Sequence, residues 1–464
     1  MDKFIKAALD YIPQFLDYQM RASEQPGCSI AIAYKGKVVL ERAFGSADLG
    51  KGEALTPRHR FRVASHSKSF TAAGVMRLRE ESKLKLDDRI GHYVEGLHKD
   101  VARATVAQLL SHSAGIIRDG GDNGQWLDRR PFLNERELRA ALAKSPILPA
   151  NTRFKYSNQG YGLIGLAIEA ITGRPYARWI KSTVIAPAGL TETTPDMPLA
   201  RGVKLAKGHS AKLPLGRRAV VPSRNLTHAL APATGFVSTA ADLARFFAQI
   251  DPAAKNSFLS VESRREMVRR QWRSPHSTPE QHYGLGTMSG TTAGWDWAGH
   301  SGGFQGTLTR SGALLGRDLS FSILTNSGLG WSAFWVESVI NILASFARNG
   351  APSRRTANWA GRWWTLWGAT DLVPMGEKVL LAAPALFNPF MDASELAVTG
   401  RDKGRITLAN GFASHGEPVR RVRAASGRVS ELWLAGTKLM SEARVAAEME
   451  KRYGTAAPKR RRRK

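Results

Sequence analysis

Apolar and polar positions near the start of the chain predict a helix followed by a β-hairpin. The apolar residues that recur at the spacing of one helix face are Phe4, Ile5, Ala8, Leu9 and Ile12. The apolar run 28–34 then predicts a buried strand. Lys35-Gly36 predicts a tight turn into a second strand at 37–44.

Helical periods dominate the central region, and strand patterns return toward residue 300. The predicted helices are 67–82, 135–144, 160–172, 239–250 and 336–347. From His300 an alternating stretch through Leu308 predicts an edge strand, and after a turn at 315–318 a second strand at 319–325 returns beside it. First and last strands that meet in one antiparallel sheet flanked by helices give an α+β fold class.

The pattern changes after a polar, Gly- and Pro-containing stretch at 349–355, which predicts a domain boundary. Four tryptophans follow, and we expect them to fill a core rather than to form a ligand cage: Trp359, Trp363, Trp364 and Trp367. Short strand patterns come next, at 378–381, 395–398, 405–408 and 431–435. We therefore predict a large domain over 1–350, a small Trp-rich β-domain over 351–455 and a basic tail over 456–464.

The chain is strongly basic, with a formal net charge of +28. The run Lys459-Arg460-Arg461-Arg462-Arg463-Lys464 concentrates part of this charge, and such a run is typically disordered. We expect only weak electrostatic binding of nucleic acid or anionic membrane through 459–464, because no nucleic-acid-binding motif accompanies it.

Other features of the composition exclude several classes of protein. A hydrophobic content of 43% and a charged content of 23% are typical of a soluble globular chain. No stretch approaches the roughly 20 apolar residues of a membrane span, and the N-terminus lacks the apolar region of a signal peptide, so a cytoplasmic location is the default expectation. Cys28 is the only cysteine and the histidines show no paired metal spacing, so we expect no disulfide, metal or cofactor.

The first candidate chemical motif is Ser65-His66-Ser67-Lys68, an S-x-x-K tetrad flanked by apolar residues. If Ser65 opens a helix, Lys68 lies one turn on, over the same face. The amine can then take the hydroxyl proton, which makes the serine a nucleophile without a histidine triad. An isolated tetrad of this kind is more often an N-cap serine with a solvated lysine, but the apolar flanks and two further motifs favour the chemical interpretation.

The second motif is Tyr156-Ser157-Asn158. Residues two apart on an extended segment point the same way, so Tyr156 and Asn158 can both enter one cleft. A phenol hydrogen-bonded to a lysine can relay a proton to a leaving group, and an amide can hold a substrate carbonyl. Taken alone, the segment is more simply a turn before a helix.

The third motif is His300-Ser301-Gly302-Gly303. Glycines here allow substrate to approach the backbone closely, so that an N–H group can serve as an oxyanion donor. His300 alone would be an ordinary histidine, and its place before Ser301, Gly302 and Gly303 is what makes it a candidate.

Three motifs in this order resemble the serine β-lactamase and penicillin-binding-protein superfamily, and are most similar to its class C β-lactamase-like branch. Two other segments, 105–116 and 232–246, are similar to further segments of that family. The resemblance covers about residues 10 to 345. It implies a β-lactamase/transpeptidase-like fold with a helical subdomain, and 351–455 is loosely similar to the lipocalin-like β-barrels of some members.

By this resemblance Ser65 is the nucleophile, Lys68 its activator and Tyr156 the proton relay. Asn158, His300, Ser301, Gly302 and Gly303 are implied to be substrate-binding, with the N–H groups of Ser65 and Gly303 forming the oxyanion hole. The chain departs from the K-T-G of many β-lactamases at His300-Ser301-Gly302. A histidine is mostly neutral at pH 7, which favours a peptidase, amidase or esterase over a dedicated β-lactamase.

Two hypotheses of different classes follow. In the first, the chain is a serine hydrolase that acts through an acyl-serine on small amides or D-amino-acid peptides, with ester or weak β-lactam hydrolysis as alternatives. In the second, it is a non-catalytic protein that binds through its basic surface and tail. The intact Ser65, Lys68 and Tyr156 favour the first. We expect the loops 119–130, 204–224 and 274–282 to shape the substrate pocket.

Overall fold

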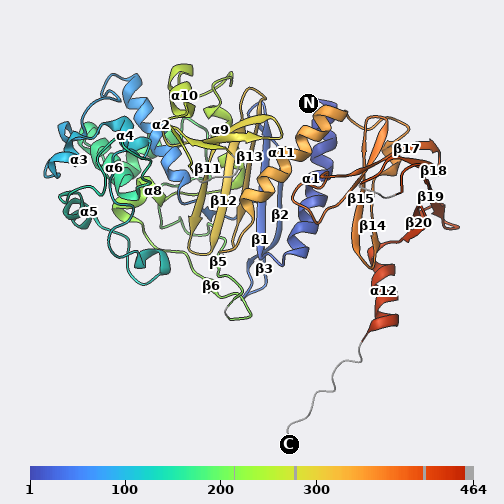
Figure 1. Cartoon of the computed structure of the whole chain (residues 1–464). Coiled ribbons are helices and arrows are strands. Elements are labelled where there is room, and N and C mark those ends of the chain that lie inside the picture. Colours follow the sequence, from blue (N-terminus) through green and yellow to red (C-terminus); the bar gives the residue numbers. More distant parts are fainter. Residues whose placement is uncertain (214, 276–279, 411–413, 455–464) are drawn as a thin grey trace, which may run out of the picture. The chain divides into compact units, whose positions relative to one another are not determined.

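The computed structural model describes residues 1–213, 215–275, 280–410 and 414–454 (Figure 1). Contacts group the chain into two compact units, one of Ser23–Val336 and one that joins Met1–Ala22 to Glu337–Lys464. Units defined by contacts need not coincide with domains along the chain. The predicted domain boundaries at residues 350 and 455 therefore stay a prediction. The basic run 459–464 lies outside the described residues.

The unit Ser23–Val336 is built on a nine-stranded antiparallel sheet, in the order β3-β2-β1-β13-β12-β11-β10-β9-β8. The strands are β1 Gly27–Tyr34, β2 Lys37–Asp48, β3 Glu53–Ala54, β8 Trp272–Arg273, β9 Gln281–Tyr283, β10 Met288–Thr292, β11 Trp295–Phe304, β12 Thr307–Leu314 and β13 Leu319–Thr325. Cys28 pairs with Thr325 and Tyr34 with Leu319, so the first hairpin joins the last strand. The predicted α+β class with one antiparallel sheet is confirmed.

The strand predicted from His300 to Leu308 is wrong in two respects. The structure has a turn at Gln305-Gly306, so His300 belongs to β11 and Leu308 to β12. Moreover β11 lies inside the sheet, between β10 and β12, and is not an edge strand. Three short strands that the pattern did not reveal, β8, β9 and β10, extend the sheet beyond it.

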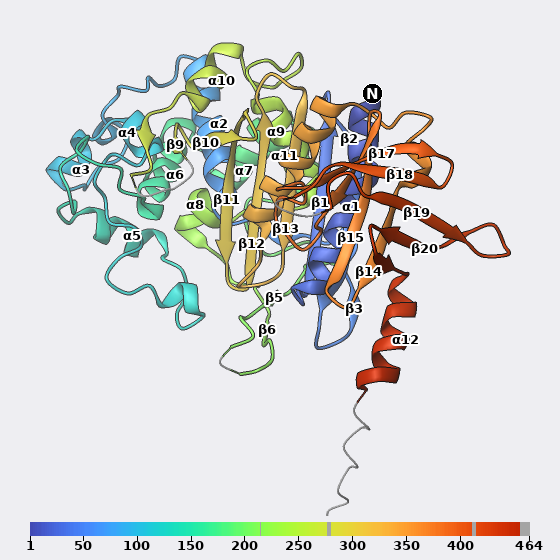
Figure 2. The same ribbon diagram turned by 45° about the vertical axis from the view of Figure 1, so that its right-hand side comes forward.

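Helices cover this sheet and form a second layer beside it. The longer ones are α2 His66–Glu80, α5 Glu135–Leu142, α6 Asn158–Thr172, α9 Ala240–Ile250 and α10 Val261–Val268. Short helical segments are α3 Lys99–Arg103, α4 Val106–Leu110, α7 Tyr176–Ile180, η3 Lys181–Ile185 and α8 Ala231–Thr234. Helix α9 contacts β1, β12 and β13, while α2 contacts both β11 and the helices α6 and α8. Both views place α4, α5 and α6 on the β11 side of the sheet, away from β1 and β2 (Figures 1 and 2).

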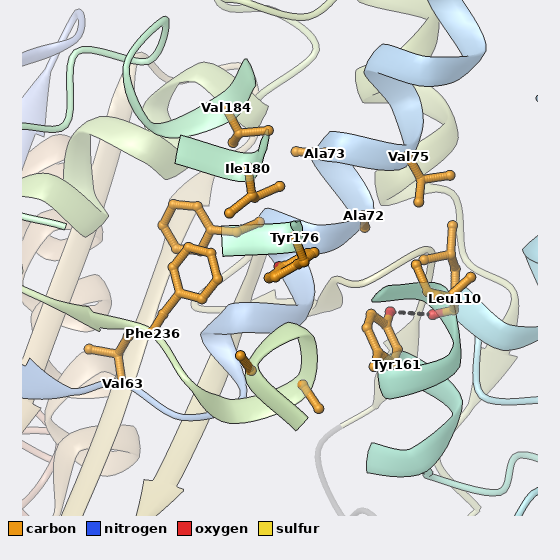
Figure 3. Packing of buried hydrophobic residues seen from close by; sticks show 14 of the residues in the cluster. Val63, Ala72, Ala73, Val75, Leu110, Tyr161, Tyr176, Ile180, Val184 and Phe236 are labelled. Atoms are coloured by element: carbon orange, nitrogen blue, oxygen red, sulfur yellow. Dashed lines mark hydrogen bonds between the residues drawn. The ribbon is translucent and has the colours of Figure 1, made fainter. Parts of the chain in front are cut away.

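Small residues let α2 pack closely at the centre of this helical region (Figure 3). A Cβ at Gly74 would lie 2.8 Å from Ile180 Cδ1 and from the ring of Trp179, both in α7, so a larger residue would have to displace these side chains. One turn earlier, the ring of Phe70 stacks on Phe236 and Phe246 with centroids 4.5 and 4.0 Å apart. Burial of these apolar side chains, at roughly 25 cal/mol per Å² of apolar surface, fixes the helix that begins at the S-x-x-K motif.

The second unit contains an eight-stranded antiparallel sheet whose two ends come together at a single bridge. Its strands are β14 Gly361–Thr365, β15 Gly368–Met375, β16 Lys378–Ala382, β17 Ser394–Gly400, β18 Lys403–Leu408, β19 Pro418–Arg423, β20 Val429–Leu434 and β21 Thr437–Leu439. Trp364 of β14 pairs with Met440, which directly follows β21. The sheet is therefore nearly a barrel, in agreement with the β-rich fold predicted for this part of the chain.

The described residues of the second unit also form the helices α1 Lys3–Ala22, most of α11 Ser332–Asn349, α12 Glu442–Tyr453 and the short η5 Ala357–Trp359. The predicted apolar face of α1 is buried at Ile5, Ala8 and Ile12. Tyr11 of this helix donates a hydrogen bond of 3.0 Å to Asp371 of β15.

The expectation that all four tryptophans fill a core is wrong for one of them. Trp359 is buried, and Trp363 and Trp364 are half-buried. Trp367, in contrast, is 96% exposed, because it stands in the turn between β14 and β15 where no neighbouring strand covers it. No helix among the described residues is long and apolar enough to cross a membrane.

Candidate active site

Ser65 stands at a sharp turn between the strand β4 Phe61–Arg62 and α2. Ala64, directly before it, has φ +46°, a left-handed conformation that costs a non-glycine residue free energy. Two hydrogen bonds of the Ser67 hydroxyl stabilise this turn. Ser67 Oγ donates to Ala64 O at 2.6 Å, and Phe236 N donates to Ser67 Oγ at 3.0 Å.

The side chain of Ser65 is free for chemistry, whereas the nearby serines are not. Ser65 is the N-cap residue of α2, so it opens the helix as the S-x-x-K interpretation supposed, but its hydroxyl makes no capping hydrogen bond. The hydroxyl of Ser67 is engaged in the turn, and that of Ser69 donates to Gly286 O at 2.6 Å. Both of these serines are completely buried. Ser65 is therefore the one hydroxyl of the motif that a substrate can reach.

The predicted partners of Ser65 meet at its Oγ atom. Tyr156 OH donates to Ser65 Oγ at 2.7 Å, and Lys68 Nζ lies 3.3 Å from the same oxygen. The S-x-x-K spacing produces the second contact, because residues three apart lie over one another on a helix.

Lys68 is fully buried, and its other hydrogen-bond partners are two oxygen acceptors. Its Nζ donates to Asn158 Oδ1 at 2.7 Å and to Ala233 O at 2.8 Å. A neutral amine has two hydrogens and one lone pair. When both hydrogens are used in these bonds, the lone pair faces Ser65 Oγ, which is the arrangement a proton acceptor requires.

Burial favours the neutral forms of the site's ionisable groups. Desolvation holds the pKa of Lys68 well below its usual value of 10.5, Asp119 opposes this shift, and Arg118 adds to it. Desolvation also raises the pKa of Tyr156 above its usual value. Burial therefore favours a neutral amine at Lys68 beside a protonated phenol at Tyr156.

Asn158 does not face a substrate in the way the sequence suggested. It is the first residue of α6, not part of an extended segment, and only 1% of it is exposed. Its Oδ1 is occupied by Lys68, and its Nδ2 donates to Asp119 Oδ1 at 2.6 Å. This geometry favours a role in holding Lys68 over a direct contact with substrate.

His300 lies on β11 with both ring nitrogens engaged. Its Nδ1 donates to the carbonyl of Ser301 at 2.6 Å, which leaves Nε2 to accept from Tyr283 OH at 2.9 Å. Burial is the main cause that holds the pKa of His300 well below 6.5, and the positive charge of Arg310 adds to it. The ring is neutral at physiological pH, as expected for a histidine in place of the K-T-G lysine.

The glycine pair after Ser301 brings β11 against the turn of Ser65. A Cβ on Gly302 would lie 2.1 Å from the carbonyl oxygen of Val63, so any side chain there would push the strand away. At Gly303 a Cβ would meet only Leu308 Cδ2, at 3.3 Å. Gly302 thus serves packing, and Gly303 faces the open site.

A cavity of about 330 Å³ opens over Ser65. Its lining residues are Ser65, Arg118, Phe154, Tyr156, Trp272, Arg273, Ser274, Gln281, His282, Tyr283, Met288, His300, Ser301 and Gly303. Among these described residues, the two arginines alone carry a permanent charge. Of the three loops expected to shape the pocket, 274–282 contributes several residues, although 276–279 lie outside the described part.

The sequence analysis did not single out Arg118, Ala233 or Tyr283, and it included Asp119 only as the first residue of the loop 119–130. Ala233 lies in the segment 232–246 that carries the family resemblance. It contacts Lys68 through its backbone carbonyl, and since every residue has one, the residue type does not reveal this contact. Asp119 follows the segment 105–116 by three residues, so its proximity to that segment was the available signal. Among the described residues no group of three or more His, Cys, Asp or Glu side chains is placed to hold a metal ion.

An antiparallel sheet beside a helical region, with a serine, a lysine and a tyrosine in contact at their junction, defines the serine β-lactamase and penicillin-binding-protein class. The Beta-lactamase family model matches residues 11–333, and the chain belongs to this family.

Known proteins similar to this chain are distant in sequence. Protein flp of Staphylococcus aureus (strain N315) is 27% identical over 187 residues, 39% of this chain and 37% of the relative. Penicillin-binding protein 4* of Bacillus subtilis (strain 168) is 29% identical over 168 residues, 36% of this chain and 37% of the relative. The aligned part of the chain spans little more than a third of these relatives' length.

Solved structures show the same fold. The octameric penicillin-binding protein homologue from Pyrococcus abyssi has a TM-score of 0.65 at 23% identity, with 93% of this chain and 99% of that chain covered. The D-amino acid amidase from Ochrobactrum anthropi SV3, in complex with L-phenylalanine amide, has a TM-score of 0.62 at 22% identity, with 73% and 96% covered. EstCE1, a hydrolase with promiscuous acyltransferase activity, has a TM-score of 0.59 at 20% identity, with 73% and 98% covered.

Proposed function

We propose that this protein is a serine hydrolase that cleaves small amides or D-amino-acid peptides through an acyl-Ser65 intermediate. The observation that carries the proposal is the contact of Ser65 Oγ with both Tyr156 OH, at 2.7 Å, and Lys68 Nζ, at 3.3 Å. A neutral lysine and a protonated tyrosine around one accessible serine hydroxyl form an acid–base pair around a nucleophile.

Acylation would begin with transfer of the Ser65 hydroxyl proton to the Lys68 lone pair as Oγ attacks the substrate carbonyl. The new ammonium keeps its bonds to Asn158 and Ala233, and its third hydrogen faces Ser65, so the lysine need not move. The carbonyl oxygen becomes an oxyanion, for which the N–H groups of Ser65 and Gly303 are the proposed donors.

The departing amine needs a proton when the carbon–nitrogen bond breaks. Tyr156 OH would supply it, and the resulting phenolate would then recover a proton from the Lys68 ammonium. In the second half-reaction a water molecule loses a proton to the same base, attacks the acyl carbon and releases the acid, while Ser65 Oγ regains its proton.

The protonated Tyr156 favours amide over ester chemistry. An amine is a poor leaving group unless it is protonated, whereas a phenolate or a stabilised alkoxide leaves without help. The structural similarity to an enzyme described as a D-amino acid amidase accords with this order. Ester hydrolysis is the second candidate, and His300, neutral where many β-lactamases have lysine, gives β-lactams a lower rank.

The test is covalent labelling together with a substrate panel. Purified protein is treated with a fluorophosphonate and assayed with a D-amino-acid amide, a D-Ala-D-Ala peptide, a short-chain p-nitrophenyl ester and a cephalosporin. We expect the adduct on Ser65, and we expect Ser65→Ala to lose both labelling and turnover while it stays folded. Ser69→Ala, which removes an engaged hydroxyl of the same helix, is the matched control and should keep labelling. An adduct on any other residue contradicts the assignment.

A cytoplasmic location and the absence of a specific nucleic-acid partner belong to the same proposal. Cell fractionation checks the first. Retention on nucleic acid that survives high salt would contradict the second, because non-specific electrostatic binding weakens steeply with salt.

A further inference from the structure

The orientation of one amide decides whether Lys68 can act as a base. Asn158 must present its oxygen to Lys68, since the amide nitrogen would offer hydrogens instead. A reversed Asn158 would draw the lysine lone pair toward its own N–H group. Ser65 would then face an N–H of the amine and could not pass on its proton.

Asp119 is placed to enforce that orientation. Its Oδ1 accepts from Asn158 Nδ2 at 2.6 Å, and its Oδ2 forms an ion pair with Arg118, with Nε 3.0 Å away. An ionised carboxylate only accepts hydrogen bonds, so the group of Asn158 that faces it must be the amide nitrogen. The oxygen of Asn158 is then directed to Lys68.

The backbone fixes Asp119 in this place. The carbonyl oxygen of Arg118 accepts from Asn158 N at 2.9 Å and from Gln159 N at 3.3 Å, which ties the loop to the start of α6. Asp119 itself is only 3% exposed. It does not line the cavity, so it has no direct access to a substrate.

We propose that Asp119 is a positioning residue that holds Lys68 in its proton-accepting geometry by fixing the amide of Asn158. The inference rests on the proposed function, because it assigns to Asp119 a part in the activation of Ser65. It concerns the rate of acylation and not the binding of substrate.

The charges around Lys68 allow this role to be separated from an effect on protonation. The groups that face Lys68 are Asp119, Arg118, His112, His300 and the rings of Tyr156 and Tyr161. Of these, Asp119 raises the pKa of Lys68 and Arg118 lowers it. Loss of the Asp119 charge would therefore make Lys68 more readily neutral. Electrostatics alone predicts no loss of activity, whereas loss of orientation predicts a slower reaction.

The discriminating variant is Asp119→Asn, which keeps size and shape. The introduced amide has one acceptor oxygen for two donors, and the charged Arg118 competes for it. The nitrogen of the introduced amide would then face Asn158 and reverse its orientation. We expect the acylation rate constant and kcat to fall roughly ten- to a hundredfold, the scale of a lost positioning contact, with KM within about twofold of the parent.

Asp242→Asn is the matched control. Asp242 is equally buried, accepts from Glu192 N and Thr193 Oγ1, and pairs with Arg245, but it has no contact with Ser65, Lys68 or Asn158. Rates are expressed per active site by titration with the fluorophosphonate. We expect any instability of the control to lower the number of active sites and not the rate constant of each.

A double-mutant cycle completes the test. If Asp119 acts through Asn158, Asp119→Asn should cost nothing further in an Asn158→Ala background, whereas a separate structural effect would add to it. Wild-type rates for Asp119→Asn, additive losses in the cycle, or a loss confined to KM would each overturn the inference. Failure of the parent protein to label at Ser65 would instead contradict the proposed function, so the two failures are distinguishable.

Discussion

At the scale of single residues, the protonation of Lys68 sets the pH range of the proposed chemistry. Lys68 must be neutral to accept a proton, and burial holds its pKa well below 10.5. Tyr156 must keep its proton, and its pKa is raised. Activity should rise as pH passes upward through the pKa of Lys68, which burial holds well below 10.5, and should then level off. A profile of kcat/KM on an uncharged substrate measures this. An acid limb centred near 10.5 would contradict a buried neutral lysine.

The hydroxyl of Tyr156 should matter more for amides than for activated esters. Tyr156→Phe keeps the ring and removes only the proton donor. We expect kcat on an amide to fall by a few powers of ten, the scale of lost general acid–base catalysis, and to fall much less on a p-nitrophenyl ester, whose leaving group needs no proton. Comparison of the two substrates on one preparation is the measurement. Tyr283→Phe, in the same cavity, is the control and should not discriminate between them; equal losses on both substrates in Tyr156→Phe would refute the relay.

Three buried histidines should make the fold sensitive to acid. Burial lowers the pKa of His66 to about 3 and holds those of His112 and His300 well below 6.5. In the unfolded chain they take up protons below about pH 6.5, which the folded chain resists. Stability is therefore full above that pH and is lost as pH falls, by roughly 1.4 kcal/mol per pH unit for each histidine. Denaturant unfolding at pH 7 and pH 5 tests this. His300→Gln should reduce the difference, and an unchanged difference would show that other groups cause it.

The sequence predicted the parts of the site that depend on local geometry. Ser65 and Lys68 meet because residues three apart on a helix lie over one another. Tyr156 was predicted to join them because its motif follows theirs in the order that the family resemblance implies. Asp119 and Tyr283 enter from a loop and a short strand, whose paths no hydrophobic period encodes. The partners of Asn158 could not be predicted for a related reason, since Lys68 and Asp119 belong to two other segments.

At the scale of elements, the approach of β11 to the turn of Ser65 depends on Gly302. Gly302→Ala places a methyl group 2.1 Å from Val63 O, so the strand or the turn must move. We expect a large loss of turnover and a loss of stability of about 1–3 kcal/mol, typical of overpacking. Thermal unfolding and active-site titration measure the two effects. Gly121→Ala, where a Cβ meets nothing within 4 Å, is the control, and equal behaviour of the two variants would contradict the packing argument.

Elements with a strong hydrophobic period were predicted well, and short ones were not. The hairpin of β1 and β2 and helices α6 and α9 appear within a few residues of the predicted bounds. Strands β8, β9 and β10 were missed because each has at most five residues and carries polar or glycine positions. Their absence from the prediction is also why β11 was placed at an edge.

At the scale of the whole molecule, the net charge of +28 should govern non-specific binding and not catalysis. Removal of 459–464, which lie outside the described residues, takes away six positive charges. We expect elution from heparin at lower salt, with turnover of an uncharged substrate unchanged, because all the site residues named above lie within Ser23–Val336. Salt-gradient elution and kcat/KM check the two expectations. A fall in turnover at equal stability would show that the tail acts on the site.

The grouping of the N-terminal helix with the C-terminal barrel was beyond the reach of sequence patterns. The spacing of apolar residues in α1 predicted which face of the helix is buried, but not which other elements pack against that face. The Tyr11 partner Asp371 lies 360 positions away, and Arg362 completes the cluster through two bonds to the same carboxylate. Contacts of such separation leave no trace in local periodicity.

Over the described residues, the nine-stranded sheet ends on both sides in strands of two residues, β3 and β8. An exposed edge is a row of unused donors and acceptors on which another chain can polymerise, and its danger grows with its length. Edges this short offer an incoming strand almost no template. In the other sheet the pairing of Trp364 with Met440 removes the edge between first and last strands. We therefore expect the native protein to resist strand-mediated aggregation during concentration and storage, with fibril formation confined to conditions that first open one of the sheets.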